Sequence, residues 1–220
     1  MKILVYTASS GVLDLADPQQ LKLLTIHDLI KGLSRRDRYG AQIGWTVLQH
    51  SLVVAELSEQ LERPTALTKR RALLHDLSEG LLGDMQQPIR VQMPFDCVWE
   101  TAHRLINREL AERYDLAVMG SLDFGWDEVP SVKLLDYLVF HAEVETFVPH
   151  GHRAGFQRRE LTKGEQKLVQ CAMRLIKALR DRPVWWLVDD FHGALESLLP
   201  DTEDDYDYDT EEEAEEDNYP

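Results

Sequence analysis

The stretch of the chain between residues 71 and 90 places several ionisable residues among leucines. His75 and Asp76 are adjacent, Glu79 follows within one helical turn of both, and Asp84 comes after Gly83. The leucines around these residues predict that the stretch is helical and packs against a core. An ionisable group beside a core is costly unless it is paired or bound to a metal. Imidazole and carboxylate groups at this spacing therefore favour a metal site.

A His-Asp pair is by itself a weak signal, because short motifs often occur without function. The chain contains a second pair at His27 and Asp28, and no acids follow it in the same pattern. We interpret Asp28 as an ordinary solvated residue on a helix face. The pair at residues 75 and 76 needs support from elsewhere in the chain.

Two chain-distant residues supply that support. His50 lies within an apolar helical stripe, with apolar residues three before it and four, seven and eleven after it. Asp136 occupies a mostly apolar face of a later helix. A lone core histidine usually bonds a backbone carbonyl, but two histidines and two aspartates are buried at low cost if one cation gathers them. We predict that His50, His75, Asp76 and Asp136 bind one metal ion.

These residues together resemble the HD-domain metal-dependent phosphohydrolases. The pattern is H…HD…D with ExxxxGD after the HD, and the resemblance covers about residues 5 to 149. Its motifs are SRRDRYG, QHSLVVA, LLHDLSEGLLGD, the P-x-R end at Pro88 and Arg90, and VKLLD. Within that superfamily the chain is most similar to bacterial 5'-deoxynucleotidases and their phage relatives, including dATP triphosphohydrolases.

The resemblance and the chemistry of the motif suggest roles for further residues. Glu79 would orient or deprotonate a water, and Asp84 would protonate the leaving oxygen. Substrate contacts are implied for four residues, Arg38, Tyr39, Arg90 and Lys133. Arginine suits bidentate phosphate contact, whereas Lys133 fits equally a surface lysine with a buried stem. The family often has Trp where this chain has Tyr39, which leaves selection for a deoxyribose open.

Two nitrogen and two oxygen ligands suit one divalent transition metal, namely Mn, Co, Fe, Ni or Zn, better than Ca. We expect the activated water to attack phosphorus, hydrolysing the phosphoester or phosphoanhydride bonds of deoxynucleotides. The motif leaves open a monophosphate or a triphosphate substrate, and cyclic or hyperphosphorylated guanosine nucleotides are a weaker option. A non-enzymatic alternative is a nucleotide-binding scaffold whose acidic tail binds a partner.

The periodicity predicts an all-α fold. The family resemblance implies that residues 1–200 form a single HD-type helical bundle. Helices are expected from Ile26 to Ser34, around His50, from Thr65 to Gly83, over residues 94–114, from Pro130, after a capping box at Thr162, and in the Trp-rich segment near residue 185.

The last 20 residues contain twelve acids and no basic residue, so residues 201–220 are expected to be disordered. This tail either aids solubility or binds a protein partner. The remaining 27 acids and 24 basic residues make the body nearly neutral, which argues against duplex nucleic acid as a substrate.

No apolar run is long enough for a membrane span or a targeting signal. We expect Cys97 and Cys171 to be buried free thiols, as in a reducing cytoplasm. The Trp-rich carboxy-terminal segment and the family resemblance together favour a homo-oligomer.

Overall fold

The computed structural model describes residues 2–41, 43–83, 98–116, 129–156 and 158–199. This part of the chain is mostly helical and contains one antiparallel pair of strands, β1 (Leu4–Thr7) and β2 (Gly11–Asp14). The all-α prediction is therefore confirmed, with a small amino-terminal hairpin added. The boundary predicted at residue 200 and the acidic tail lie outside the described residues.

The hairpin is followed by a series of helices, of which the short 3-10 helices are labelled η. In chain order they are α1 (Pro18–Leu21), α2 (Ile26–Leu33), η1 (Arg38–Ala41), α3 (Val47–Ser58), α4 (Ala66–Leu74), α5 (Glu79–Leu82), α7 (Val98–Arg113), α8 (Pro130–Phe147), η3 (His150–Gly155), α9 (Lys163–Leu179) and α10 (Val184–Glu196). Among the described helices, none combines the length and apolar character needed to cross a bilayer.

Helix α3 is at the centre of the fold. Every residue of this helix except Glu56 is buried. Its start is defined by a capping box, in which Thr46 and Gln49 each bond the other's backbone N–H. This fixed start sets which side chains of α3, including His50, face each neighbouring helix.

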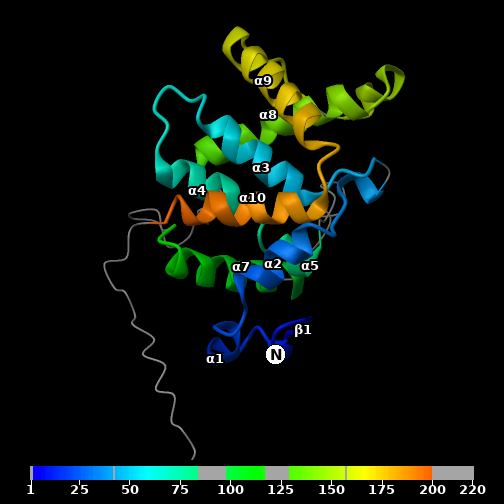
Figure 1. Cartoon of the computed structure of the whole chain (residues 1–220). Helices are drawn as coiled ribbons and strands as arrows, with labels where there is room; N and C mark the ends of the chain where they lie inside the picture. The colour runs from blue at the N-terminus through cyan, green and yellow to red at the C-terminus, as the bar shows by residue number, and fades with distance from the viewer. Residues whose placement is uncertain (1, 42, 84–97, 117–128, 157, 200–220) are drawn as a thin grey trace, which may run out of the picture.

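Two hydrophobic cores meet at α3. One core joins α3 to the hairpin, α2, α4, α7 and α10, and the other joins α3 to α8 and α9. In Figure 1, α10 crosses the middle of the molecule, with α3, α4 and α8 on one side and α2, α5 and α7 on the other. Residues from α3, α4 and α8 can therefore approach one another on one side of α10.

Helices α2 and α5 approach each other at the level of their backbones. A Cβ atom added to Gly32 would lie 2.0 Å from the carbonyl oxygen of Gly80, and one added to Gly80 would lie 2.2 Å from the carbonyl oxygen of Leu29. Only glycine fits at both positions, because any side chain would push the two helices apart. This contact holds α5, which begins at Glu79, against α2.

The predicted continuous helix from Thr65 to Gly83 is wrong. Helix α4 ends at Leu74, residues 75–78 form a turn, and α5 begins at Glu79. The turn is tightened by bonds that span three residues, from the N–H of Leu77 to the Leu74 carbonyl and from the N–H of Glu79 to the Asp76 carbonyl, both 2.9 Å. His75 and Asp76 therefore lie at a break between two helices.

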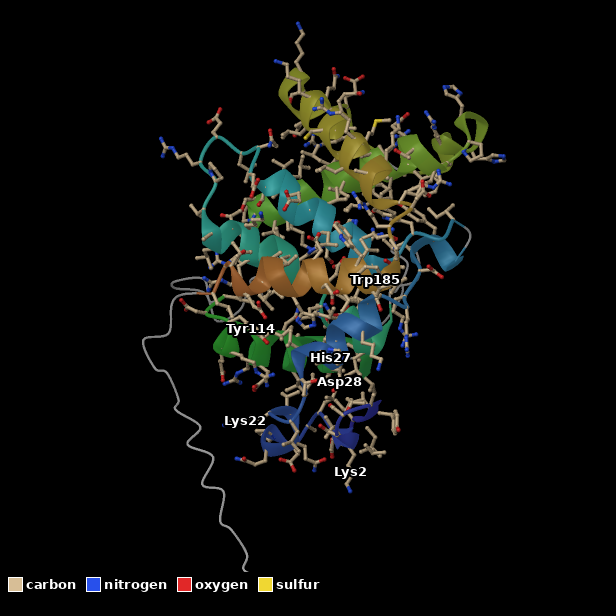
Figure 2. The ribbon with its side chains drawn as sticks, in the orientation of Figure 1. Lys2, Lys22, His27, Asp28, Tyr114 and Trp185 are labelled. Carbon is tan, nitrogen blue, oxygen red and sulfur yellow. The ribbon has the colours of Figure 1, made fainter. Side chains whose placement is uncertain are left out.

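The interpretation of Asp28 as a solvated residue is also wrong. Its side chain is buried, and its carboxylate accepts hydrogen bonds from the backbone N–H of Ser9, the Ser9 hydroxyl and the Thr25 hydroxyl. Figure 2 shows Asp28 on α2, on the side of the amino-terminal hairpin. Asp28 thus joins the hairpin to the helical body.

The other predictions outside the site have mixed outcomes. The caps at Thr25 and Thr65, the start of α8 at Pro130 and the capping box at Thr162 are confirmed. Cys171 is only half-buried, because it lies at the margin of the second core, and Cys97 lies outside the described residues. Trp185 is 67% exposed at the start of α10 (Figure 2), and the expected homo-oligomer stays a prediction.

Candidate metal centre

Three side chains from two parts of the fold meet at α3. His50 comes from the middle of α3, and His75 and Asp76 come from the turn after α4. One donor atom from each lies within 4.8 Å of the other two, and the imidazole ring centroids of His50 and His75 are 5.3 Å apart. These three of the four predicted ligands could hold a metal ion, and Asp136 is not in this group.

The Nδ1 atoms of both histidines are already engaged. The Nδ1 of His50 lies 2.7 Å from Glu143 Oε1, and the Nδ1 of His75 lies 2.7 Å from the carbonyl oxygen of Ala72. A carbonyl and an ionised carboxylate can only accept a hydrogen bond, so each Nδ1 carries a proton. This arrangement leaves Nε2 as the atom of each ring that can bind a metal.

The Nε2 atoms face the two aspartates. The Nε2 of His75 lies 3.1 Å from Asp76 Oδ2, yet this buried nitrogen makes no hydrogen bond with the described residues. The Nε2 of His50 lies 3.7 Å from the same Asp76 oxygen and 3.1 Å from Asp136 Oδ1. The Asp136 carboxylate from α8 therefore reaches the nitrogen of His50 that would face a metal, although its side chain is 34% exposed.

Glu143, two turns after Asp136 on α8, is the buried partner of the site. Its fully buried carboxylate accepts hydrogen bonds of 2.7 Å from the Trp45 indole N–H and from the Tyr39 hydroxyl. The Arg38 guanidinium lies 3.3 Å from the same carboxylate and 3.5 Å from Asp76. Glu143 therefore ties the segment before α3 to α8 and orients the His50 ring.

The carboxylates create a strongly anionic environment around His50. Burial and the charge of Arg38 act to lower the pKa of His50, but Glu143 and Asp136 outweigh them and raise it to about 9. Burial acts to raise the pKa of Glu143, but the charges of Arg38 and His50 lower it to about 2. A cation at the Nε2 atoms would therefore face ionised carboxylates.

The two aspartates are ionised for related reasons. Burial acts to raise the pKa of Asp76, but the charges of His75, His50 and Arg38 lower it well below its ordinary range. For Asp136, burial acts in the same direction and the hydrogen bond and charge of His50 lower the pKa. Carboxylates kept ionised beside two imidazoles match the donor chemistry of a transition-metal site.

The structure describes some of the remaining predicted site residues and not others. Glu79 is buried at the first turn of α5 and is not one of the three residues that could hold the ion. Tyr39 has a positive φ of 57° and its hydroxyl is committed to Glu143. Lys133 is exposed on α8, one turn before Asp136. The predicted acid Asp84 and the predicted phosphate contact Arg90 lie outside the described residues.

Sequence reasoning assigned no role to Glu143 or Trp45. The signal that could have found Glu143 was its position seven residues after Asp136, which places both acids on the same face of one helix. No comparable signal exists for Trp45, because its partner is 98 residues away in the chain.

The donor set fits a metal ion on two grounds. The buried Nε2 of His75 has no hydrogen-bond partner among the described residues, and the Nδ1 contacts orient both rings for ligation.

No protein-family model matches the chain, and no curated protein matches it either. The chemistry assigned to this centre therefore depends on the geometry of its residues and on the motif that contains them.

Proposed function

We propose that this protein is a metal-dependent phosphohydrolase of the HD-domain type that acts on deoxynucleotides. The observation that carries the proposal is the convergence of His50, His75 and Asp76, with both Nδ1 atoms bonded and both Nε2 atoms facing carboxylates. The resemblance of the H…HD…D pattern to that superfamily supports the substrate class. Asp136 is proposed as the fourth ligand, because its Oδ1 lies 3.1 Å from His50 Nε2.

A divalent ion of Mn, Co, Fe, Ni or Zn, when bound by these residues, would supply a Lewis acid for a phosphate oxygen and activate water. Glu79 would accept a proton from the attacking water, and Asp84 would donate one to the leaving oxygen. Arg38, Arg90 and Lys133 would bind the phosphate charge, and Tyr39 would pack against the sugar or the base.

Arg38 would have two tasks in this scheme. Its guanidinium lies within 3.5 Å of both Asp76 and Glu143, so it neutralises part of the carboxylate charge in the absence of substrate. A guanidinium offers five N–H donors in a planar fork, which allows one group to bond a carboxylate and a phosphate together. Arg38 would thereby place the phosphate next to the ligands.

The test is phosphate release from a panel of deoxynucleoside mono- and triphosphates, using the full chain after removal of metal with EDTA. We expect turnover with added Mn²⁺ or Co²⁺ and none with EDTA alone. Chromatography of the products identifies the bond that is cleaved and so separates the two substrate classes. The exposed residue Asp181 provides the matched control, because Asp181→Ala should retain the turnover that Asp76→Ala removes.

Two results would overturn this proposal. Turnover that persists in Asp76→Ala would remove the metal centre from the chemistry. Nucleotide binding without turnover for any member of the panel would favour a binding scaffold instead, and the acidic tail would then be tested as its partner-binding arm.

A further inference from the structure

A cavity of about 380 Å³ lies beside α8, η3 and the start of α9. Six of its lining residues carry the argument, namely His141, Glu145, Arg153, Phe156, Arg158 and Arg159. None of them belongs to the metal centre or to the substrate contacts proposed above. The cavity therefore calls for an explanation of its own.

His141 is the buried polar residue in the wall of this cavity. Only 5% of its surface is exposed, and its Nε2 has no hydrogen-bond partner among the described residues. His141 follows Asp136 by five residues, which rotates it by roughly 140° around the helix axis. It is thus on a different face of α8 from the proposed ligand, and its buried nitrogen needs a partner such as a water or a ligand.

The arginines give the cavity unbalanced donors. Arg153 and Arg158 share the single carboxylate of Glu145, and Arg153 also bonds the carbonyl oxygen of Val148. Arg158 contacts Glu145 through one terminal nitrogen at 2.7 Å, and its other N–H groups bond none of the described residues. Two guanidinium groups on one carboxylate leave a positive charge and free donors at Arg158.

The other charged groups of the cavity do not occupy those donors. Arg159 is paired with Glu165 through two hydrogen bonds, and the exposed Glu160 also lines the cavity. Burial, together with the charges of Arg158 and Arg159, lowers the pKa of His141, so its imidazole is neutral at pH 7. A phosphate group near neutral pH offers both acceptor oxygens and an O–H, so either tautomer of His141 finds a partner in it.

We propose that this cavity is a second anion site, which binds a phosphate group through His141 Nε2 and the N–H groups of Arg158. The phosphate can come from inorganic phosphate or from a nucleotide. A nucleotide would place an aromatic base near the Phe156 ring, which packs 6.0 Å from Phe140 and 6.3 Å from Tyr39, centroid to centroid. The proposal does not depend on the metal centre.

The experiment titrates the full chain carrying Asp76→Ala with inorganic phosphate and, separately, with dAMP. Binding is measured by calorimetry, and the histidine ring signals are followed by NMR, with His141 assigned from a His141→Gln variant. We expect the His141 ring signals to shift on addition of phosphate. Arg158→Gln should weaken phosphate binding about tenfold, the value of one charge-assisted hydrogen bond.

Arg174→Gln is the matched control, because Arg174 is exposed on α9 and does not line the cavity. If Arg158→Gln fails to fold, Arg158→Lys replaces it, since lysine keeps the charge but loses the planar fork. Equal affinity for phosphate and dAMP identifies the phosphate group alone as the ligand. Tighter dAMP binding that Arg158→Gln weakens identifies a nucleotide at this cavity.

The proposal is overturned if neither ligand moves the His141 signals, or if Arg158→Gln and Arg174→Gln weaken binding equally. These outcomes are independent of the turnover assay, because the Asp76→Ala chain is not expected to hydrolyse either ligand. Failure of the anion site would leave the phosphohydrolase proposal standing, and the reverse also holds.

Discussion

The Nδ1 of His50 and the Oε1 of Glu143 lie 2.7 Å apart, and both side chains are fully buried. The same carboxylate accepts hydrogen bonds from Trp45 and Tyr39, so its position is determined by α3 and by the segment that precedes it. A metal-binding histidine commonly has such a carboxylate on its other nitrogen, which sets the tautomer and the ring orientation. Glu143 is therefore a positioning residue for the proposed ligand His50.

Replacing Glu143 with glutamine tests this positioning role. An amide oxygen in the place of Oε1 can still accept the bonds from His50 and Trp45, but the negative charge is lost and the amide NH₂ faces the Tyr39 hydroxyl and the Arg38 guanidinium. We expect affinity for Mn²⁺ to fall by about 10–100-fold, the range typical of such outer partners. Calorimetric titration of the EDTA-treated chain measures this change.

Glu196→Gln is the control for that measurement, because Glu196 is exposed at the end of α10. It makes the same chemical change at a distance from the centre and should leave the affinity for Mn²⁺ unaltered. Equal affinities for Mn²⁺ in the Glu143→Gln and Glu196→Gln chains would show that Glu143 does not act on the metal ligand.

The contact between α2 and α5 predicts a large effect at Gly80. A Cβ at this position would lie 2.2 Å from the Leu29 carbonyl oxygen, so Gly80→Ala must displace backbone and should cost about 1–3 kcal/mol of unfolding free energy. A Cβ added to Gly193 on α10 would meet no atom within 4 Å, and Gly193→Ala should be neutral or stabilising by up to about 1 kcal/mol. Urea unfolding of the two variants compares them, and equal stabilities would contradict the close packing.

Asp28→Asn should weaken the junction between the hairpin and α2, at a cost of about 1–3 kcal/mol at pH 7. Burial acts to raise the pKa of Asp28, but hydrogen bonds from Ser9 and Thr25 outweigh it and hold the pKa below 3.8. Because the folded-state pKa is the lower one, the stabilisation is present above pH 3.8 and decreases as the pH falls below it. Urea unfolding at about pH 7 and about pH 3 should show a smaller difference between wild type and variant at the lower pH, and a constant difference would refute this assignment.

Much of the candidate site could be predicted from local spacing. The adjacent pair at His75 and Asp76, and the apolar stripes around His50 and Asp136, are visible in the sequence because burying such groups without partners is unfavourable. The capping residues Thr25 and Thr65 were also predictable, since a cap acts on N–H groups only two or three residues away.

The remaining features depend on contacts between distant segments. The partners of Glu143 lie about a hundred residues earlier in the chain, and Asp28 is buried only because the hairpin folds over it. The break after Leu74 has no glycine or proline to mark it, so helical periodicity continued through it. Such a break is set by how α5 packs against α2, which no local pattern encodes.

The most direct test of the account is the metal stoichiometry of the chain itself. After treatment with EDTA and titration with Mn²⁺ or Co²⁺, the wild-type protein should bind one ion per chain, and His75→Ala should lose that ion because His75 Nε2 is one of its proposed ligands. The exposed His152→Ala chain should bind as the wild type does. Wild-type protein that binds no ion, or His75→Ala protein that binds one with unchanged affinity, would contradict the metal centre.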